Sequence, residues 1–581
     1  MKRLTLLFLM AGAIFFFFSP LWLEKSKCAP LDIIKNLYEP WVNSVYDTEV
    51  NNPYVTDAID QYLPYLKHAH NSYEKEGYLG WNYLKHCGTP AYSNTMAVNF
   101  GLPHQFLRFF SFWTAWHLGL VFQFSVALVG MYTFLRGRSV STFLSLGGAC
   151  SFAFCAHFSV WIFHLWAAGL GWLPWIFWSL YKLKDRSKWG GLAPVFMAFS
   201  FLGVHLQYAF FLVLAITALW VGWAFDDWRK KRIFNVTQLF SFVVCGILAI
   251  GMSSMMFIPN VYAYLNTLDA GLTRGGIGYP SGFLSALSNL FVYPLFSFPW
   301  LIGSPDTLDV SKLFGTELMH IPFFGSVLVL LAFIGIFRRE VDNVARILML
   351  LGLFLPITPL VGPLYPRVLI LFTFAGIRAA VELIANAKDD VWKKILHKVY
   401  VMFLGISLLL VFVGMTALIF NDQLVHHMSN YIQNRVTYHR FGSLEEWYFS
   451  RMHEFLAEIK FWNPRMFFPW LLFGLSLITL RYRKKEHFQL LMAIFIFLQL
   501  FTYSREWVTF SSFPNEEVEL YEVTDDIKNI QKIVGDTGRV IVAQEEGELP
   551  FLPLNTLTVF GIPCAGGYDS IIPNGMQRGV P

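Results

Sequence analysis

The chain has 581 residues, of which 55% are hydrophobic and only 14% are charged, with a formal net charge of +5. The low charge and the mean hydropathy of +0.48 exclude an ordinary water-soluble domain, since such domains carry about 25% charged residues. The small net charge gives no support to nucleic-acid binding. Long, continuously apolar runs recur along the chain, each near the roughly 20 residues that cross a bilayer as a helix. They predict an all-α polytopic membrane protein and not a β-barrel.

The first predicted transmembrane helix covers 4–23 and follows the basic residues Lys2 and Arg3. A charged stretch, 24–27, stands where a signal peptide would have a small-residue cleavage site, so we expect an uncleaved helix that starts in the cytoplasm. The other twelve predicted helices lie at about 109–135, 139–160, 161–181, 189–206, 207–225, 235–258, 320–337, 345–365, 367–387, 398–420, 464–480 and 486–503.

Basic clusters follow every second predicted helix. These clusters are Arg136/Arg138, Lys182–Lys188, Arg229–Arg232, Arg338/Arg339, Lys393/Lys394 and Arg481–Lys485. With the N-terminus in the cytoplasm, all six fall on the cytoplasmic side, as the positive-inside rule requires. The pattern therefore predicts about 13 transmembrane helices, with the N-terminus cytoplasmic and the C-terminus extracytoplasmic.

This topology predicts two parts of the chain: a transmembrane domain, 1–503, and an extracytoplasmic C-terminal domain, 504–581. The first outer loop, 24–108, is large, and a second outer loop covers 259–319. A smaller amphipathic segment, 421–463, is expected along the surface. In the C-terminal domain Asp525–Val534 has a helical pattern and Gly538–Ala543 is typical of a strand, which predicts a small α/β-type segment.

The first outer loop contains the stretch VTDAIDQYLPYLKHAH, from Val55 to His70. A helix over 57–73 would gather apolar and aromatic side chains on one face, which predicts an interfacial helix with a kink at Pro64. Asp57 and Asp60 would be neighbours at i and i+3. Two interpretations remain open: Thr56 or Asp57 caps the helix and Asp60 is solvated, or an aspartate is a general base at the outer membrane face.

Other polar residues are expected at the same outer face. Arg274, Arg367 and Arg378 are candidates for binding a phosphate group, because its developing charge needs cations. The alternatives are a pair between Arg378 and Glu382, one turn on, and an Arg367 that reaches for lipid headgroups. Candidates for binding sugar hydroxyls are His157, His164, His205 and Gln207, each of which has an equally good structural interpretation.

No metal or cofactor is expected. The six cysteines make no ligand pattern, and no pair of histidines has the HExxH spacing. The stretch Gly275–Gly278 lacks the Lys-Ser/Thr of a phosphate-binding loop. Without a nucleotide-binding motif, direct use of a nucleotide sugar and ATP-driven transport are both disfavoured.

Several short motifs occur in a specific order. They are LGWN (Leu79–Asn82), GTPAYSN (Gly88–Asn94), AVNFGLPHQFL (Ala97–Leu107), HLWAAGLGWLPW (His164–Trp175), GVHLQYAFF (Gly203–Phe211), TELMHIPFFG (Thr316–Gly325) and GGYDSIIP (Gly566–Pro573). With the QYLP that follows Asp60, this order resembles the YfhO-like bacterial membrane proteins, a family similar to the GT-C class of multi-helix glycosyltransferases. The chain departs from the family at Tyr83, where relatives usually have a proline. Relatives also usually continue past the Tyr-Asp-Ser motif, so the resemblance implies that the C-terminal domain is short or truncated.

The resemblance implies a function. A GT-C-like enzyme in the bacterial cytoplasmic (inner) membrane would transfer a sugar, with inversion, from a polyprenyl-phosphate donor to an envelope glycan, lipid or protein. Asp57 would be the general base with Asp60 in support, and Gln61, Trp81 and Asn82 join the expected substrate-binding residues.

Two other functions stay open. The chain could be a lipid-linked glycan flippase or exporter, or a non-catalytic protein of envelope assembly. Transporters keep charged residues near the membrane midplane and often show internal repeats. Here the ionisable residues gather towards the outer loops and no repeat is evident, which favours the enzyme.

Overall fold

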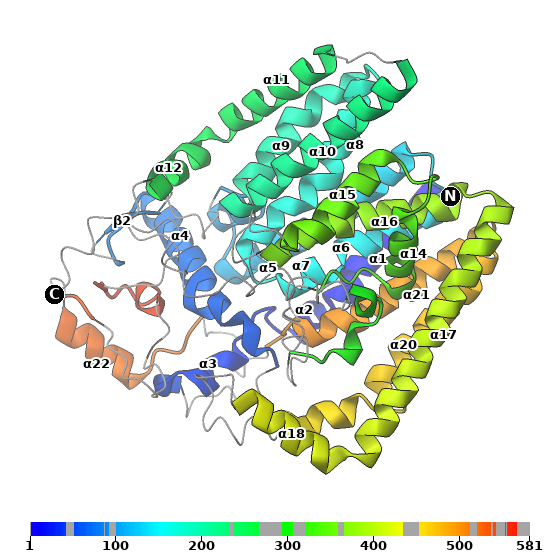
Figure 1. Ribbon diagram of the computed structural model, residues 1–581. Coiled ribbons are helices and arrows are strands. Elements are labelled where there is room, and N and C mark those ends of the chain that lie inside the picture. Colours follow the sequence, from blue (N-terminus) through cyan, green and yellow to red (C-terminus); the bar gives the residue numbers. More distant parts are fainter. Residues whose placement is uncertain are drawn as a thin grey trace.

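The computed structural model describes residues 2–41, 51–85, 88–91, 100–231, 236–265, 293–305, 321–357, 365–433, 452–511, 520–535, 538–541, 552 and 555–565. Most of these residues are helical, and the long helices pack side by side in one bundle (Figure 1). Continuously apolar segments form helices because a helix satisfies its own backbone hydrogen bonds without water.

The helices of the first half, in chain order, are α1 (Lys2–Phe17), α2 (Ser19–Leu23), α3 (Asp32–Leu37), α4 (Leu63–Glu76), α5 (Phe112–Gly137), α6 (Thr142–Ala153), α7 (Ala156–Val160), α8 (Leu173–Lys184), α9 (Ala193–Leu202), α10 (Leu206–Lys231), α11 (Val236–Met252) and α12 (Ser254–Leu265). Those of the second half are α14 (Ser326–Ile336), α15 (Asn343–Phe354), α16 (Leu369–Asn386), α17 (Asp389–Ile419), α18 (Asn421–Gln433), α20 (Pro464–Arg481), α21 (Glu486–Trp507) and α22 (Asp525–Val534). The strands β1 (Trp81–Asn82) and β2 (Thr89–Pro90) pair antiparallel, with Trp81 opposite Pro90 and Asn82 opposite Thr89.

Each of the thirteen predicted transmembrane ranges overlaps at least one of these helices. Among the described residues, six helices are long and apolar enough to cross a membrane alone, and a bent pair raises this number to seven. Three more apolar helices are shorter, at Leu4–Phe17, Ser326–Ile336 and Asn343–Phe354. A helical membrane protein with several spans is therefore confirmed, whereas the count of thirteen and the orientation stay predictions.

The bent pair is α11 and α12, which meet at an angle of 80°. The predicted range 235–258 is therefore not one straight helix. The bend falls at Ser253, which separates the two helices, and Pro259 lies within α12. The pair lies along one edge of the bundle in Figure 1.

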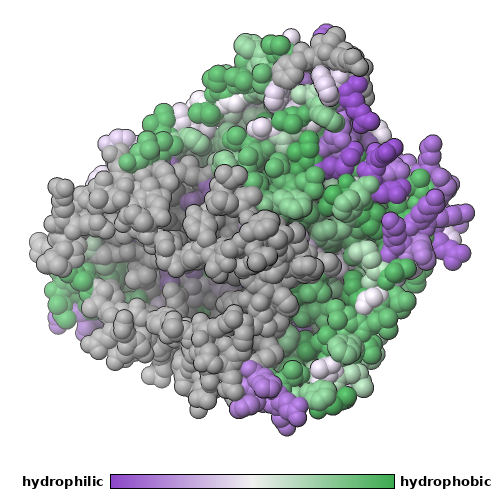
Figure 2. Space-filling view, viewed as in Figure 1, coloured by the Kyte–Doolittle hydropathy of each residue, from purple (hydrophilic) through white to green (hydrophobic). Residues whose placement is uncertain are grey.

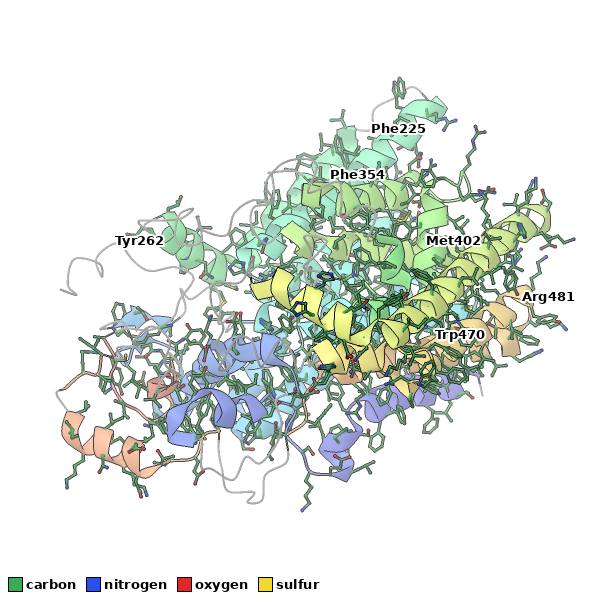
Figure 3. All side chains as sticks on the ribbon, turned by 60° about the horizontal axis from the view of Figure 1, so that its bottom comes forward. Phe225, Tyr262, Phe354, Met402, Trp470 and Arg481 are labelled. Atoms are coloured by element: carbon green, nitrogen blue, oxygen red, sulfur yellow. The ribbon has the colours of Figure 1, made fainter. Side chains whose placement is uncertain are left out.

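The loops that carry the basic clusters come together at one end of the bundle, here called the basic end. The contacts that join them are Lys184 with Trp223, Asp226 with Asn343, Arg138 with Asp342, Ser141 with Gln489, and Arg483 and Lys484 with Asp389. The N-terminus and Arg481 lie at this end (Figures 1 and 3). The structure thus confirms that these loops share one side, which is what the alternation of basic clusters predicts.

Apolar side chains cover much of the exposed surface between the two ends. Figure 2 shows this apolar surface and a hydrophilic rim at the basic end. The long helix α17 illustrates it, because it exposes apolar side chains along most of its length, among them Val401, Leu404, Leu408, Phe412 and Ile419. Such a surface suits contact with lipid.

The first loop and the C-terminal segment share the opposite end of the bundle, here called the loop end (Figure 1). The predicted helix Asp525–Val534 is confirmed as α22, capped by the Thr524 side chain. Within the predicted strand Gly538–Ala543, Val540 forms an isolated parallel bridge with Cys564, and 542–543 lie outside the described residues. The backbone at Lys27 likewise pairs with Ser511, which ties the start of the first loop to the segment after α21.

Candidate functional site

The stretch that contains Asp57 and Asp60 folds into a π-helical turn, η3 (Ala58–Tyr62), which continues directly into α4. The amide of Leu63 donates to the carbonyl of Ala58, five residues back. Pro64 is the second residue of α4. Because proline has no amide to donate, the predicted kink becomes a widened turn before it, and such π-turns are frequent at functional sites.

The helix that follows is enclosed by protein. Every residue from Ala58 to His70 is buried, including Lys67 and His68. The nearby helical segment η5 (Leu102–Arg108) packs against α4, and the His70 ring nitrogen Nδ1 lies 3.1 Å from the carbonyl of Leu107. The prediction of an interfacial helix with one buried face is therefore wrong, since other parts of the loop end cover its polar face too.

The two aspartates have different surroundings. Asp57 occupies the N-cap position of η3, but its side chain makes no capping hydrogen bond, and it is half-buried. Asp60 is only 5% exposed, and its carboxylate accepts a hydrogen bond from the hydroxyl of Tyr38. The expectation of a solvated Asp60 is therefore wrong, and Asp57 provides no side-chain cap, whereas the role of general base stays a prediction.

Gln61 lies between Asp60 and Tyr62 on the same turn and is fully buried, with 0% exposure. Neither its amide oxygen nor its amide nitrogen has a hydrogen-bond partner among the described residues. A buried amide without partners costs about 1–3 kcal/mol, so native structures seldom keep one without a reason. Binding of a hydroxyl-rich ligand would provide both partners.

Beside this turn lies a group of side chains that we call the aromatic cluster. Its members are Tyr62, His157, Trp161, His164, Tyr208 and Arg367. The ring of His164 lies between the rings of Tyr62 and Trp161, with centroids 5.0 Å and 4.7 Å away. The guanidinium of Arg367 lies 4.8 Å from the centre of the Trp161 ring. The first loop, the segment after α7 and the start of α16 thus contribute to one cluster.

The second histidine, His157, lies beside Tyr208, with ring centroids 5.6 Å apart, and Tyr208 is close enough to Arg367 to interact with its charge. Tyr208 lies in the first turn of α10, next to two predicted substrate residues. These are His205 and Gln207, both half-buried, and the backbone N–H of Gln207 donates to the His205 ring nitrogen Nδ1 over 3.3 Å. The structure therefore brings all four predicted His and Gln residues to one region.

His164 is 2% exposed, and its ring lies close enough to Arg367 to interact with the charge of its guanidinium. A neutral imidazole carries one donor and one acceptor nitrogen. Together with the guanidinium of Arg367, which is always charged, the cluster offers polar groups for hydroxyls and a cation for an anionic group.

Trp81 and Asn82 form strand β1, and both side chains make contacts within its hairpin. The Asn82 side chain accepts a hydrogen bond from the Leu84 amide over 3.1 Å, which fixes the hairpin turn. Trp81 is largely exposed, and its indole lies against Gly88, which has a positive φ of 116°. The motifs LGWN and GTP thus contribute the two strands of one hairpin.

Arg378 lies far from this region. It is fully buried, and it forms ion pairs with Glu382 and Asp342. Arg138 of the basic end pairs with the same two carboxylates. Arg378 is eleven residues beyond Arg367, which is about 16 Å along a helix. The alternative pairing with Glu382 is confirmed, and the placement gives no support to a phosphate-binding role; Arg274 lies outside the described residues.

A separate small pocket lies between α4, η5 and α5. The buried side chain of Gln123 borders it, and the amide nitrogen of Gln123 has no hydrogen-bond partner among the described residues. Its lining is otherwise mostly apolar and consists of Leu66, Pro103, His104, Leu107, Ala115, Trp116, Gly119, Leu120 and Ile162. None of these residues belongs to the aromatic cluster.

Sequence reasoning missed Tyr38, Tyr62, Trp161 and Tyr208. Aromatic residues make up 18% of this chain, so an additional Tyr or Trp gives no signal of its own. Tyr62 and Tyr208 do lie directly beside predicted residues. In the part of the chain that the structure describes, no three His, Cys, Asp or Glu side chains are grouped to hold a metal ion.

The comparisons with known proteins agree with the motif order. No curated protein and no solved structure matches the chain. The model of the family described as "Bacterial membrane protein YfhO" matches residues 40–540, which include η3, α4 and the whole aromatic cluster. The chain therefore belongs to the YfhO family of bacterial membrane proteins.

Proposed function

We propose that this protein is an inverting membrane glycosyltransferase. It would transfer a sugar from a polyprenyl-phosphate-linked donor to a cell-envelope glycan, lipid or protein on the extracytoplasmic face of the bacterial cytoplasmic membrane. The observation that carries this proposal is the buried turn with Asp57, Asp60 and Gln61 beside the aromatic cluster. It combines carboxylates, an amide with no hydrogen-bond partner among the described residues, an imidazole and a cation at one end of a membrane protein.

Each group has a task in such a transfer. Asp57, the more accessible carboxylate, takes the proton from the acceptor hydroxyl. The acceptor oxygen attacks the anomeric carbon from the side opposite the phosphate, which inverts the configuration. The bond from the anomeric carbon to the phosphate oxygen breaks, and the polyprenyl phosphate leaves with the electron pair. Arg367 stabilises the charge on that phosphate.

The remaining groups suit sugar recognition. The side-chain amide of Gln61 and an imidazole such as that of His164 can donate hydrogen bonds to hydroxyls and accept hydrogen bonds from them. The aromatic faces of Trp161 and Tyr62 offer apolar surface of the kind that packs against a sugar ring. The orientation rests on the basic end, which the positive-inside rule assigns to the cytoplasm. A membrane-soluble donor is then the available kind at the loop end.

The test is transfer of a radiolabelled hexose from synthetic polyprenyl-phosphate hexoses to envelope fractions by the purified protein. Asp57→Asn keeps a side chain that suits an N-cap but removes the base, so we expect the rate to fall by about 10²–10⁴. The matched control is Asp390→Asn, an exposed residue in the first turn of α17 at the basic end, which is expected to keep the wild-type rate.

Full activity of Asp57→Asn would remove Asp57 from this role. Absence of transfer by the wild type to every envelope fraction, with translocation of the lipid-linked sugar intact in liposomes, would overturn the enzyme proposal and favour a flippase.

A further inference from the structure

Two side chains of the C-terminal segment reach the backbone of η3. The hydroxyl of Tyr521 donates to the carbonyl of Ile59, and the amide nitrogen of Asn555 donates to the carbonyl of Asp60. Both hydrogen bonds measure 2.8 Å. These partners are more than 460 residues apart in the sequence, and Figures 1 and 3 show the C-terminal segment, orange to red, beside the blue helices of the first loop.

Pro64 removes the helical donor that one of these two carbonyls would otherwise have. In an α-helix the amide of residue 64 would donate to the carbonyl of Asp60, and in a π-turn it would donate to that of Ile59. Residue 64 is a proline and has no amide hydrogen. Because buried carbonyls need partners, the C-terminal segment completes a turn that the first loop cannot complete from its own backbone.

The two donors are themselves firmly held. Tyr521 is 4% exposed, and its ring packs against Trp41 and Phe560, with centroids 5.8 Å and 6.2 Å away. Asn555 is 2% exposed, and its amide nitrogen also lies 3.4 Å from the hydroxyl of Tyr65, which accepts a hydrogen bond from Lys85. Buried donors fixed in this way can define the shape of the turn.

We propose that Tyr521 and Asn555 are positioning residues. Through their hydrogen bonds the C-terminal segment fixes the conformation of the π-turn, which begins directly after Asp57 and contains Asp60. The consequence for catalysis rests on the proposed function. Displacement of a catalytic carboxylate by about 1 Å can lower the reaction rate 10²-fold. The C-terminal segment, although distant from the reacting groups, would therefore affect kcat.

Hydrogen–deuterium exchange of the full-length protein tests the contact itself. The variants are Tyr521→Phe, which removes only a hydroxyl, and Asn555→Ala. The matched control is Tyr293→Phe, because the Tyr293 hydroxyl donates to the Leu353 carbonyl over 3.0 Å and is equally buried. We expect amides of 58–66 to exchange about fivefold faster in both variants, the change that loss of one neutral hydrogen bond gives, and at the wild-type rate in the control. Unchanged exchange in both variants would overturn the proposal.

The transferase assay separates positioning from mere stability. Both variants are expected to lower kcat by about tenfold with KM unchanged, whereas Tyr293→Phe keeps both constants. A wild-type kcat in the two variants despite faster exchange would overturn the positioning role. An inactive wild type would overturn the proposed function, and the exchange result would still decide whether the C-terminal segment holds the turn.

Discussion

The hydroxyl of Tyr38 donates a hydrogen bond to the carboxylate of Asp60, and both side chains are almost fully buried. This contact fixes one of the two aspartates of the first loop and leaves the other, the half-buried Asp57, as the more accessible carboxylate. Under the proposed function, this difference in surroundings would make Asp57 the reacting aspartate and Asp60 the supporting one.

Replacement of Tyr38 by Phe should lower the free energy of unfolding by about 2 kcal/mol, because hydrogen bonds to charged groups contribute about 1.5–3 kcal/mol. The control is Tyr73→Phe in α4, since the buried hydroxyl of Tyr73 has no hydrogen-bond partner in the described structure. Its removal is expected to change stability by less than about 0.5 kcal/mol. Chemical unfolding in detergent measures both, and equal effects would contradict a charged partner for Tyr38.

Arg367 is expected to act on the reaction more than on stability. Arg367→Gln removes the cation of the aromatic cluster, so transfer should fall by about 10²–10³, the loss typical of a group that stabilises developing negative charge. Stability should fall by only about 1 kcal/mol, the contribution of a partly exposed cation–π contact. Arg367→Lys keeps the charge and should recover part of the rate. A wild-type rate in Arg367→Gln would show that the leaving phosphate is stabilised elsewhere.

Arg378 should behave in the opposite way. Arg378→Met leaves the buried Glu382 and the nearby Asp342 with one cation fewer, and loss of one partner from a buried ion pair costs about 3–5 kcal/mol. The double variant Arg378→Met, Glu382→Met should recover part of this loss. Transfer per folded molecule should stay at the wild-type rate in both. A stable Arg378 variant with weak transfer would return this residue to the candidate site.

The helices could be predicted from the sequence because their cause is local. An apolar run of about 20 residues has few alternatives to a helix in lipid. Every predicted transmembrane range overlaps a helix of the structure. The separation of Arg378 from Arg367 could also be predicted from the sequence, because eleven residues of helix correspond to about 16 Å. Helix geometry thus favours the pairing with Glu382 over a shared phosphate site, as the structure shows.

The shape of the candidate site could not be predicted in the same way. The π-turn depends on donors from Tyr521 and Asn555, which lie more than 460 residues further along the chain. No local pattern around Asp57 signals them. The burial of α4 has the same cause, because a helix with an apolar face looks interfacial until the segments that cover its polar face are known. Contacts between segments distant in the sequence thus determine the π-turn and the burial of α4, which local helix propensity does not specify.

Two buried groups near the first loop titrate with opposite effects. Burial, together with the smaller effect of the positive charge of Lys85, lowers the pKa of His68 in α4 to about 4. Burial raises the pKa of Asp32 to about 6, against the hydrogen bonds that its carboxylate accepts from backbone amides. In the unfolded chain these pKa values are about 6.5 and 3.9. Acidification from pH 6.5 to pH 4 therefore favours the unfolded state through His68 and the folded state through Asp32.

Because the two effects offset each other in the wild type, the contribution of His68 is measured by comparing the free energy of unfolding of the wild type with that of His68→Gln. Between pH 6.5 and about 4 the unfolded state is protonated at His68, whereas the folded state is not. The wild-type free energy of unfolding should thus fall, relative to that of His68→Gln, by about 3 kcal/mol over this range. Any cost of the buried glutamine is independent of pH and leaves this slope unchanged. Denaturant unfolding at pH 6.5, 5 and 4 measures it, and parallel pH profiles would mean that His68 is protonated in the folded protein.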